Sequence, residues 1–191
     1  INTNTPFFFK INAIIFVAAL LLVGNILGTS EGSALGEYDS FQQEGDVRRY
    51  EGETLSYDIS FLWFDKAATA TVSFYKRADH YESLLIAETK GFVGWFTSYR
   101  KHVYRSTFDI LENGKRLRSN KFEREVIIGS SKDRTIHHID YATHTHRWVH
   151  TKSDSSVIAL DEKGSEEIPA GTNYDDILTA FYNFRNSAYG K

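Results

Sequence analysis

Residues 52–76, GETLSYDISFLWFDKAATATVSFYK, contain two runs in which apolar and polar side chains alternate. A period of two is typical of β-strands that bury one face. The large apolar positions of the two runs are Leu55, Tyr57, Ile59, Phe61 and Trp63, and then Ala68, Ala70, Val72 and Phe74. Between the runs, the more polar residues 64–67 are expected to reverse the chain. The pattern therefore predicts an antiparallel hairpin with one apolar face.

Similar strand-like runs continue after the hairpin, at residues 81–92, 99–111, 116–128, 131–141, 146–152 and 156–160. They are rich in Thr, Val, Ile, Tyr and Phe, and Gly, Asn and Asp separate them, which favours an antiparallel meander. Residues 91–98, GFVGWFTS, interrupt this series, and we expect a turn or a short helix packed on the sheet. We place the carboxylates Asp161, Glu162, Glu166 and Glu167 in a polar loop.

The spacing of apolar residues changes near the end of the chain. Asp176 can cap a helix, and the apolar positions that follow are three and four residues apart: Ile177, Ala180, Phe181, Phe184 and Ala188. We expect these positions to form the buried side of a short helix. The predicted fold class is mainly β, a curved antiparallel sheet or half-open barrel with one short C-terminal helix.

The first thirty residues have the composition of a targeting segment. Residues 11–27 are almost entirely apolar, Lys10 precedes them, and small polar residues follow. This order predicts an N-terminal helix at residues 1–30 that is either a secretory signal or an uncleaved membrane anchor. If it is uncleaved, it would hold the protein at the membrane. Residues 31–49 are interpreted as a polar linker and 50–191 as the exported β domain.

Composition excludes several classes of function. The chain has no cysteine, which rules out disulfides, thiolate nucleophiles, cysteine zinc sites and a lipid on an N-terminal cysteine. The net charge is only −3, so we expect no nucleic-acid partner. A basic run within residues 115–124 is interleaved with Glu112, Glu123 and Glu125, which is typical of a solvated strand face. A contact with inner-leaflet or lipopolysaccharide phosphates is the alternative.

No motif indicates catalysis. Gly129-Ser130-Ser131 lacks the Gly-x-Ser-x-Gly pattern of a nucleophile elbow, and no glycine-rich phosphate loop precedes a helix. We predict no enzyme, no catalytic residues and no cofactor.

Histidines cluster between residues 137 and 150, and they provide the only weak candidates for a metal site. His144, His146 and His150 share a parity, so an extended strand would place them on one face. His144 and His146 could then meet one ion, but His150 would lie about 13 Å beyond His146 along the strand. Without a third ligand we predict no metal site, and the simpler interpretation is an exposed polar strand face.

Three motifs carry a family resemblance. They are Gly52-Glu53-x-Leu55-x-Tyr57-Asp58, then Tyr104-Arg105-Ser106-x-x-Asp109, and finally Ile168-Pro169-x-Gly171-Thr172 with Asp176-x-Leu178-Thr179-Ala180-x-Tyr182-x-x-Arg185. In this order, over about residues 50–187, they resemble the bacterial exported family known as domain of unknown function 3108.

The resemblance implies a periplasmic or outer-membrane location in a Gram-negative bacterium and a curved, mostly antiparallel sheet. A looser similarity of fold links it to the half-open barrels of the lipoprotein carriers LolA and LolB. The family offers no activity or catalytic residues to transfer. Its members usually continue for several strands beyond the last motif. Because this chain also has no methionine, we expect a fragment truncated at both ends.

Three functions remain open. The first is an exported envelope module that binds a lipid or another hydrophobic ligand on a concave sheet face. Its candidate lining residues are Tyr57, Ile59, Phe61, Val72, Phe74, Trp95 and Phe181. The second is a structural or protein-interaction domain of the envelope with a filled core. The third is a metal-dependent enzyme that uses the histidine-rich strands.

Overall fold

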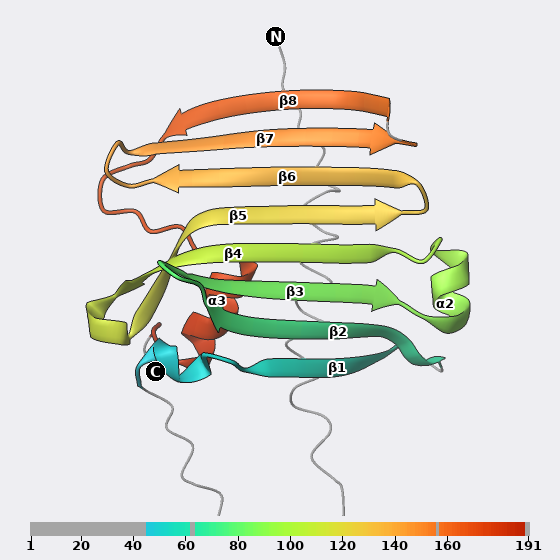
Figure 1. The fold of residues 1–191 in the computed structure, drawn as a ribbon, viewed down its shortest axis with the longest axis horizontal. Helices are drawn as coiled ribbons and strands as arrows, with labels where there is room; N and C mark the ends of the chain where they lie inside the picture. Colours follow the sequence, from blue (N-terminus) through green and yellow to red (C-terminus); the bar gives the residue numbers. More distant parts are fainter. Residues whose placement is uncertain (1–44, 62–63, 156, 190–191) are drawn as a thin grey trace, which may run out of the picture. The chain divides into compact units, whose positions relative to one another are not determined.

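The computed structural model describes residues 45–61, 64–155 and 157–189, which belong to one compact unit (Figure 1). The expected signal or anchor at 1–30 and most of the linker lie outside the described residues. The elements of the described part are η1 (Val47–Tyr50), β1 (Thr54–Phe61), β2 (Phe64–Lys76), β3 (Tyr81–Thr89), α2 (Gly91–Phe96), β4 (Lys101–Leu111), η2 (Glu112–Gly114), β5 (Arg116–Ile128), β6 (Ser131–Asp140), β7 (Thr145–Asp154), β8 (Val157–Glu167) and α3 (Ile177–Arg185).

The described strands form one curved sheet in the order β1 to β8, and each strand pairs antiparallel with the next. The sheet does not close, so β1 and β8 are its two edges (Figure 1). A meander of this kind follows from alternating strands that are joined by short polar turns. The predicted fold class is therefore confirmed for the domain.

The opening hairpin has the predicted alternation. Along β2, Ala68, Ala70, Val72 and Phe74 are buried, while the residues between them are only half-buried. Its turn was predicted wrongly, because β2 already begins at Phe64 instead of after residue 67. The pairing shifts between Ile59 and Phe61, and Lys66 adopts a left-handed φ of 52°. An irregular stretch of strand therefore replaces the expected four-residue turn.

Two other segments differ from their prediction or refine it. Residues 161–167, expected in a polar loop, form most of β8, because each of them finds a partner on β7. Charged side chains suit an edge strand, where they discourage pairing with another chain. Residues 91–98 do contain the short helix α2, but Phe96 is 77% exposed. This helix presents its aromatic side chains to solvent instead of packing all of them on the sheet.

The C-terminal helix α3 packs on one face of the sheet against β3, β4 and β5 (Figure 1). Asp176 caps it as predicted, since its carboxylate accepts the backbone N–H groups of Leu178 and Thr179 at 2.8 and 3.1 Å. The predicted buried side was wrong. Phe184 is 69% exposed, and the buried residues of the helix are Leu178, Thr179, Tyr182 and Asn183.

Polar contacts explain which side of α3 is buried. Asn183 accepts the N–H of Leu117 at 2.8 Å and donates to the C=O of Leu117 at 2.9 Å. The pairing of β5 with β6 begins only at Lys121, so this part of β5 lies beyond the ladder. The amide of Asn183 takes the place of a neighbouring strand, and the helix is thereby fixed to the sheet.

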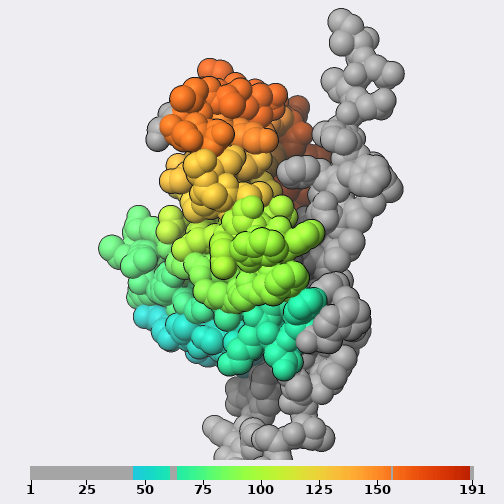
Figure 2. All heavy atoms as spheres, turned by 90° about the vertical axis from the view of Figure 1, so that its right-hand side faces the viewer, coloured from blue at the N-terminus to red at the C-terminus, as the bar shows by residue number. Residues whose placement is uncertain are grey.

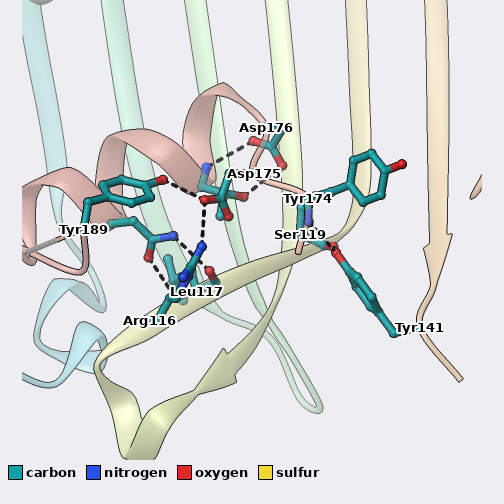
Figure 3. A network of polar contacts seen from close by, with 10 residues as sticks. Arg116, Leu117, Ser119, Tyr141, Tyr174, Asp175, Asp176 and Tyr189 are labelled. Atoms are coloured by element: carbon teal, nitrogen blue, oxygen red, sulfur yellow. Dashed lines mark hydrogen bonds and ion pairs between the residues drawn. The ribbon is translucent and has the colours of Figure 1, made fainter. Parts of the chain in front are cut away.

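The segment before α3 continues this replacement (Figure 3). The N–H of Ser119 donates to the C=O of Tyr174 at 3.2 Å. The hydroxyl of Tyr141 donates to the C=O of Ser119 at 2.8 Å and accepts the N–H of Tyr174 at 3.1 Å. A chain segment and one tyrosine hydroxyl therefore satisfy backbone groups that no strand reaches.

Phe74 is the centre of the core beneath α3. It is fully buried, and its ring lies 4.8 Å from that of Tyr182, 5.8 Å from Phe108 and 5.8 Å from Tyr81. Tyr50 adds an edge contact at 6.4 Å. Together these rings connect η1, three strands and α3 in one aromatic cluster.

The packed part of the chain includes η1, which precedes β1. Asp46 caps this short helix, and Val47 is fully buried, three residues before the expected start of the domain near Tyr50. Within the described residues, no helix has the length and apolar character needed to span a bilayer.

Candidate binding face

We call the face of the sheet that carries α3 the helix face. The strand registers place residues on it in rows that run across the sheet. One row reads Tyr57, Ala70, Ala87 and His102, from β1 to β4. Large side chains therefore flank two alanines, which are 1% exposed. Ala68, a third small and buried residue beside Ala70, extends this strip of small side chains on β2 and β3.

Small side chains also lie where α3 packs. Ser83, Ser106 and Ser119 occupy β3, β4 and β5, the three strands that α3 contacts, and all three are fully buried. Ala87 lies four residues beyond Ser83 on the same strand, about 13 Å towards the α2 end. The serines leave room for the helix. At the other end of the same face the side chains of Ala68, Ala70 and Ala87 are equally small and buried, and we call this strip the alanine trough.

The helix face becomes polar towards β8. Arg124 donates to Asp133 at 3.0 Å, and His150 lies 3.4 Å from the same carboxylate. On its other side, His150 lies 3.8 Å from Glu162 on the edge strand. These four residues come from four successive strands, β5 to β8. The helix face thus joins an apolar region on β1–β3 to a charged region on β5–β8.

A second polar chain lies nearer to α3. His137 and His146 are hydrogen-bonded at 2.9 Å, and His146 is hydrogen-bonded to Glu166 at 2.8 Å. Burial, together with the neighbouring His146, lowers the pKa of His137. Phe122 and Tyr174 add ring contacts to these imidazoles. Hydrogen bonds and ring contacts therefore fix the orientation of both imidazoles.

His102 forms the wall of the alanine trough on β4. Burial, together with the charges of Arg100 and Arg124, lowers its pKa to about 4. In the unfolded chain the pKa of a histidine is near 6.5. Between about pH 4 and pH 6.5, the unfolded state therefore binds a proton at this residue and the folded state does not. At neutral pH the imidazole of His102 in the folded protein is therefore uncharged.

Acid should therefore destabilise the domain through His102. We expect the free energy of unfolding to fall by roughly 1–2 kcal/mol as the pH drops from about 6.5 to about 4, after allowance for partial exposure. Urea unfolding of the wild type and of His102→Gln at several pH values measures this term as the difference between the two curves. His144→Gln, in an exposed turn, is the control. Parallel pH profiles for wild type and His102→Gln would contradict the expectation.

The predicted lining residues fall into three groups. Tyr57, Ile59 and Val72 lie on the helix face beside the alanine trough. Phe74 is on the same face but is enclosed by the aromatic cluster under α3, and Phe181 packs edge-to-face on Tyr182 at 5.0 Å. Trp95 is 66% exposed on α2 and does not join them. The side chain of Phe61 lies outside the described part.

Several residues of the helix face were not predicted. They are Ala87 and His102 beside the trough, and Arg124, Asp133 and Glu162 in the charged region. The alternation within β3 to β8 was visible in the sequence, but the registers that align these strands were not. To predict that Ala87 lies opposite Ala70, the length of the turn between β2 and β3 must be known. Strand propensity alone does not give this length.

The family-motif residues gather mainly around α3. Arg185 forms a two-bond salt bridge with Glu53 at 2.5 and 2.8 Å, and these residues are 132 positions apart. The remaining motif residues have structural roles or none that is visible. Gly52 and Gly171 have positive φ, Ser106 and Tyr182 are buried, Asp176 is the helix cap, and Pro169 is exposed. Asp58 forms an ion pair with Lys66, and Asp109 forms one with Arg118. The Glu53–Arg185 pair therefore ties the segment just before β1 to α3.

The histidine candidates for a metal do not meet as their parity suggested. His144 precedes β7 in a turn with a left-handed φ of 51° and is exposed. The imidazole next to His146 is that of His137, from the neighbouring strand. Among the residues that the structure describes, no group of three His, Asp or Glu side chains is arranged to hold a metal ion.

A shallow hollow of about 280 Å³ lies on the opposite face of the sheet. Its lining includes Glu125, Arg134, Val149 and Thr151 from β5, β6 and β7. Arg134 is already engaged with Glu123 at 2.7 Å. The hollow's lining of mixed charge and its little depth do not suit an apolar ligand.

No protein-family model matches the chain, and neither a curated protein nor a solved structure was found to match it. The resemblance to the domain of unknown function 3108 family stays a prediction. The function has to be inferred from the residues themselves.

Proposed function

We propose that this protein is an exported envelope module that binds an amphiphile on the helix face. The observation that carries the proposal is the division of this face into an apolar trough and a charged region. An acyl chain would lie over Ala68, Ala70 and Ala87. Its polar head group would lie towards Arg124, Asp133 and His150. A lipid, or the lipid anchor of an envelope protein, has this chemistry.

The apolar part offers what a hydrocarbon chain needs. Leu85 and Val72 are paired neighbours beside the alanines and supply branched apolar surface. Tyr57 and His102 stand on either side, and burial raises the pKa of Tyr57 and lowers that of His102. Both groups therefore stay neutral at physiological pH, so the walls bring no charge against a hydrocarbon.

The charged part suits a polar head group. Asp133 is shared by Arg124 and His150. Burial raises the pKa of the neighbouring Tyr104, and the charge of Arg124 offsets part of this effect. A head group could exchange hydrogen bonds with this set without leaving a charge unpaired. The proposal does not include bond-making chemistry, since these groups are paired with each other and no nucleophile stands among them.

The location belongs to the proposal as well. Residues 11–27 have the order of an export signal or anchor, and the three family motifs point to the periplasm or the outer membrane of a Gram-negative bacterium. An amphiphile carrier or receptor would have its ligands at hand in that compartment.

Filling the trough should abolish binding. In Ala70→Phe or Ala87→Phe, the larger ring occupies the room of an acyl chain, so we expect affinity for a fluorescent fatty acid to fall by at least about tenfold. Thr71→Phe is the matched control, because Thr71 neighbours Ala70 but points to the opposite face. Titration of the fatty acid, with urea unfolding to check the fold of each variant, gives the result.

The outcome also separates the proposal from its alternative. Native mass spectrometry of protein purified from the periplasm should reveal a bound amphiphile. If the protein is ligand-free and takes up no fatty acid, the trough is part of a filled core. The protein is then a structural or protein-interaction domain.

A further inference from the structure

Exposed apolar side chains gather at one end of the sheet. In an antiparallel meander, the connections that follow odd-numbered strands share one end, so α2 and the start of β8 lie at the same end (Figure 1). Large apolar side chains exposed there are Phe92 (60%), Trp95 (66%), Phe96 (77%), Tyr99 (61%), Val157 (70%) and Ile158 (65%). Single exposed apolar residues are ordinary on a protein surface, but a group at one end is not.

The aromatic group around α2 is held in place. The rings of Phe92 and Phe64 stack at 5.7 Å, and Phe92 contacts Trp95 at the same distance. Tyr99 closes the turn, because its N–H donates to the C=O of Gly94 at 2.6 Å and its ring lies against Gly94. The exposed rings therefore stand on a fixed support and do not need to be ordered on binding.

Charge at this connection has one sign. Residues 90–101, KGFVGWFTSYRK, contain Lys90, Arg100 and Lys101 and no acidic residue. Lys90 and Lys101 both pair with Glu88, at 2.8 and 3.0 Å, which leaves a net positive charge beside the rings. Trp and Tyr favour the boundary between lipid head groups and acyl chains, and basic residues favour anionic lipid phosphates.

The connections at the opposite end have a different character. Residues 77–80, 112–115 and 141–144 are short polar turns, and none of them contains a large apolar side chain that is strongly exposed. Figure 2 looks onto the α2 end, with the last two strands in orange at the top. The connections at the two ends of the sheet thus differ in both polarity and charge.

We infer that the α2 end docks on a bilayer that contains anionic phospholipids, with Trp95 and Phe96 inserted at the head-group boundary. The docking surface consists of Phe92, Trp95, Phe96 and Tyr99 with Lys90, Arg100 and Lys101. This inference does not depend on ligand binding in the alanine trough. It does place the trough next to a membrane from which an amphiphile could enter.

The absence of cysteine makes a site-specific test simple. Phe96→Cys in the full chain is labelled with an environment-sensitive fluorophore and mixed with vesicles of phosphatidylcholine and phosphatidylglycerol. We expect a blue shift and quenching by brominated lipid. The same label on Asn173→Cys, an exposed position away from the α2 end, should show neither change. Because the full chain is used, any membrane tether in residues 1–30 affects both positions alike.

Affinity gives a second readout. Trp95→Ser combined with Phe96→Ser should weaken partition onto these vesicles by about tenfold, and added salt should weaken wild-type binding. Phe184→Ser, equally exposed but on α3, is the matched control and should bind as the wild type does.

Three results would overturn the docking surface. They are equal insertion of the labels at positions 96 and 173, insertion at neither, or a label at 96 that is already shielded without vesicles, which indicates a second copy of the chain. Fatty-acid binding should survive the Trp95 and Phe96 substitutions, and vesicle docking should survive Ala70→Phe. Failure of one proposal is therefore distinguishable from failure of the other.

Discussion

Asn183→Leu is expected to lower the free energy of unfolding by about 2–4 kcal/mol, although leucine has the same number of side-chain heavy atoms. The amide of Asn183 is fully buried and satisfies both the N–H and the C=O of Leu117. Leucine would leave both backbone groups buried without a partner, and such groups are costly. Urea unfolding followed by circular dichroism measures the loss.

Asn173→Leu is the matched control for this prediction. Asn173 is exposed in the loop before α3, so the same chemical change should alter stability by less than about 0.5 kcal/mol. If Asn183→Leu were as mild as this control, the edge of β5 would not depend on the helix.

Phe74→Ala is expected to be at least as damaging, with a loss of about 3–5 kcal/mol. Its ring is fully buried among Tyr81, Phe108 and Tyr182, and alanine would leave a cavity at the point where α3 meets the sheet. The melting temperature and the urea midpoint should both fall. Phe74→Leu, which fills part of the cavity, should lose clearly less.

Phe96→Ala provides the comparison for a ring of the same size in solvent. Because Phe96 is 77% exposed, its removal should change stability by less than about 0.5 kcal/mol, while membrane docking suffers. Similar losses for the two variants would mean that the ring cluster is not the centre of the core.

The strands were predictable because their evidence is local. Alternation in residues 52–76 and in the later runs gave the strands and the meander, since each strand exposes one face and buries the other. It also placed Tyr57, Ile59 and Val72 on a single face. Boundaries were less certain where charge was high, as in β8, because pairing with β7 outweighs the low strand propensity of Asp and Glu.

The buried side of α3 could not be read from its apolar spacing. Apolar periodicity favoured Phe181 and Phe184, whereas the structure buries Tyr182 and Asn183. Tyr182 is buried because its ring packs in the aromatic cluster around Phe74. Asn183 is buried because its amide hydrogen-bonds to the backbone of β5. These contacts are with Phe74 and Leu117, residues more than sixty positions away along the chain.

By itself, the sequence determined a β-rich domain of one sheet, the faces of its strands and the absence of cysteine chemistry. Only the tertiary structure aligned Ala70 with Ala87, brought Arg124 to Asp133 and His150, and placed the exposed rings of α2 at the same end as the start of β8. Alternation is a property of each strand alone. Register and helix placement depend on contacts between distant segments, and the alanine trough is made of such contacts.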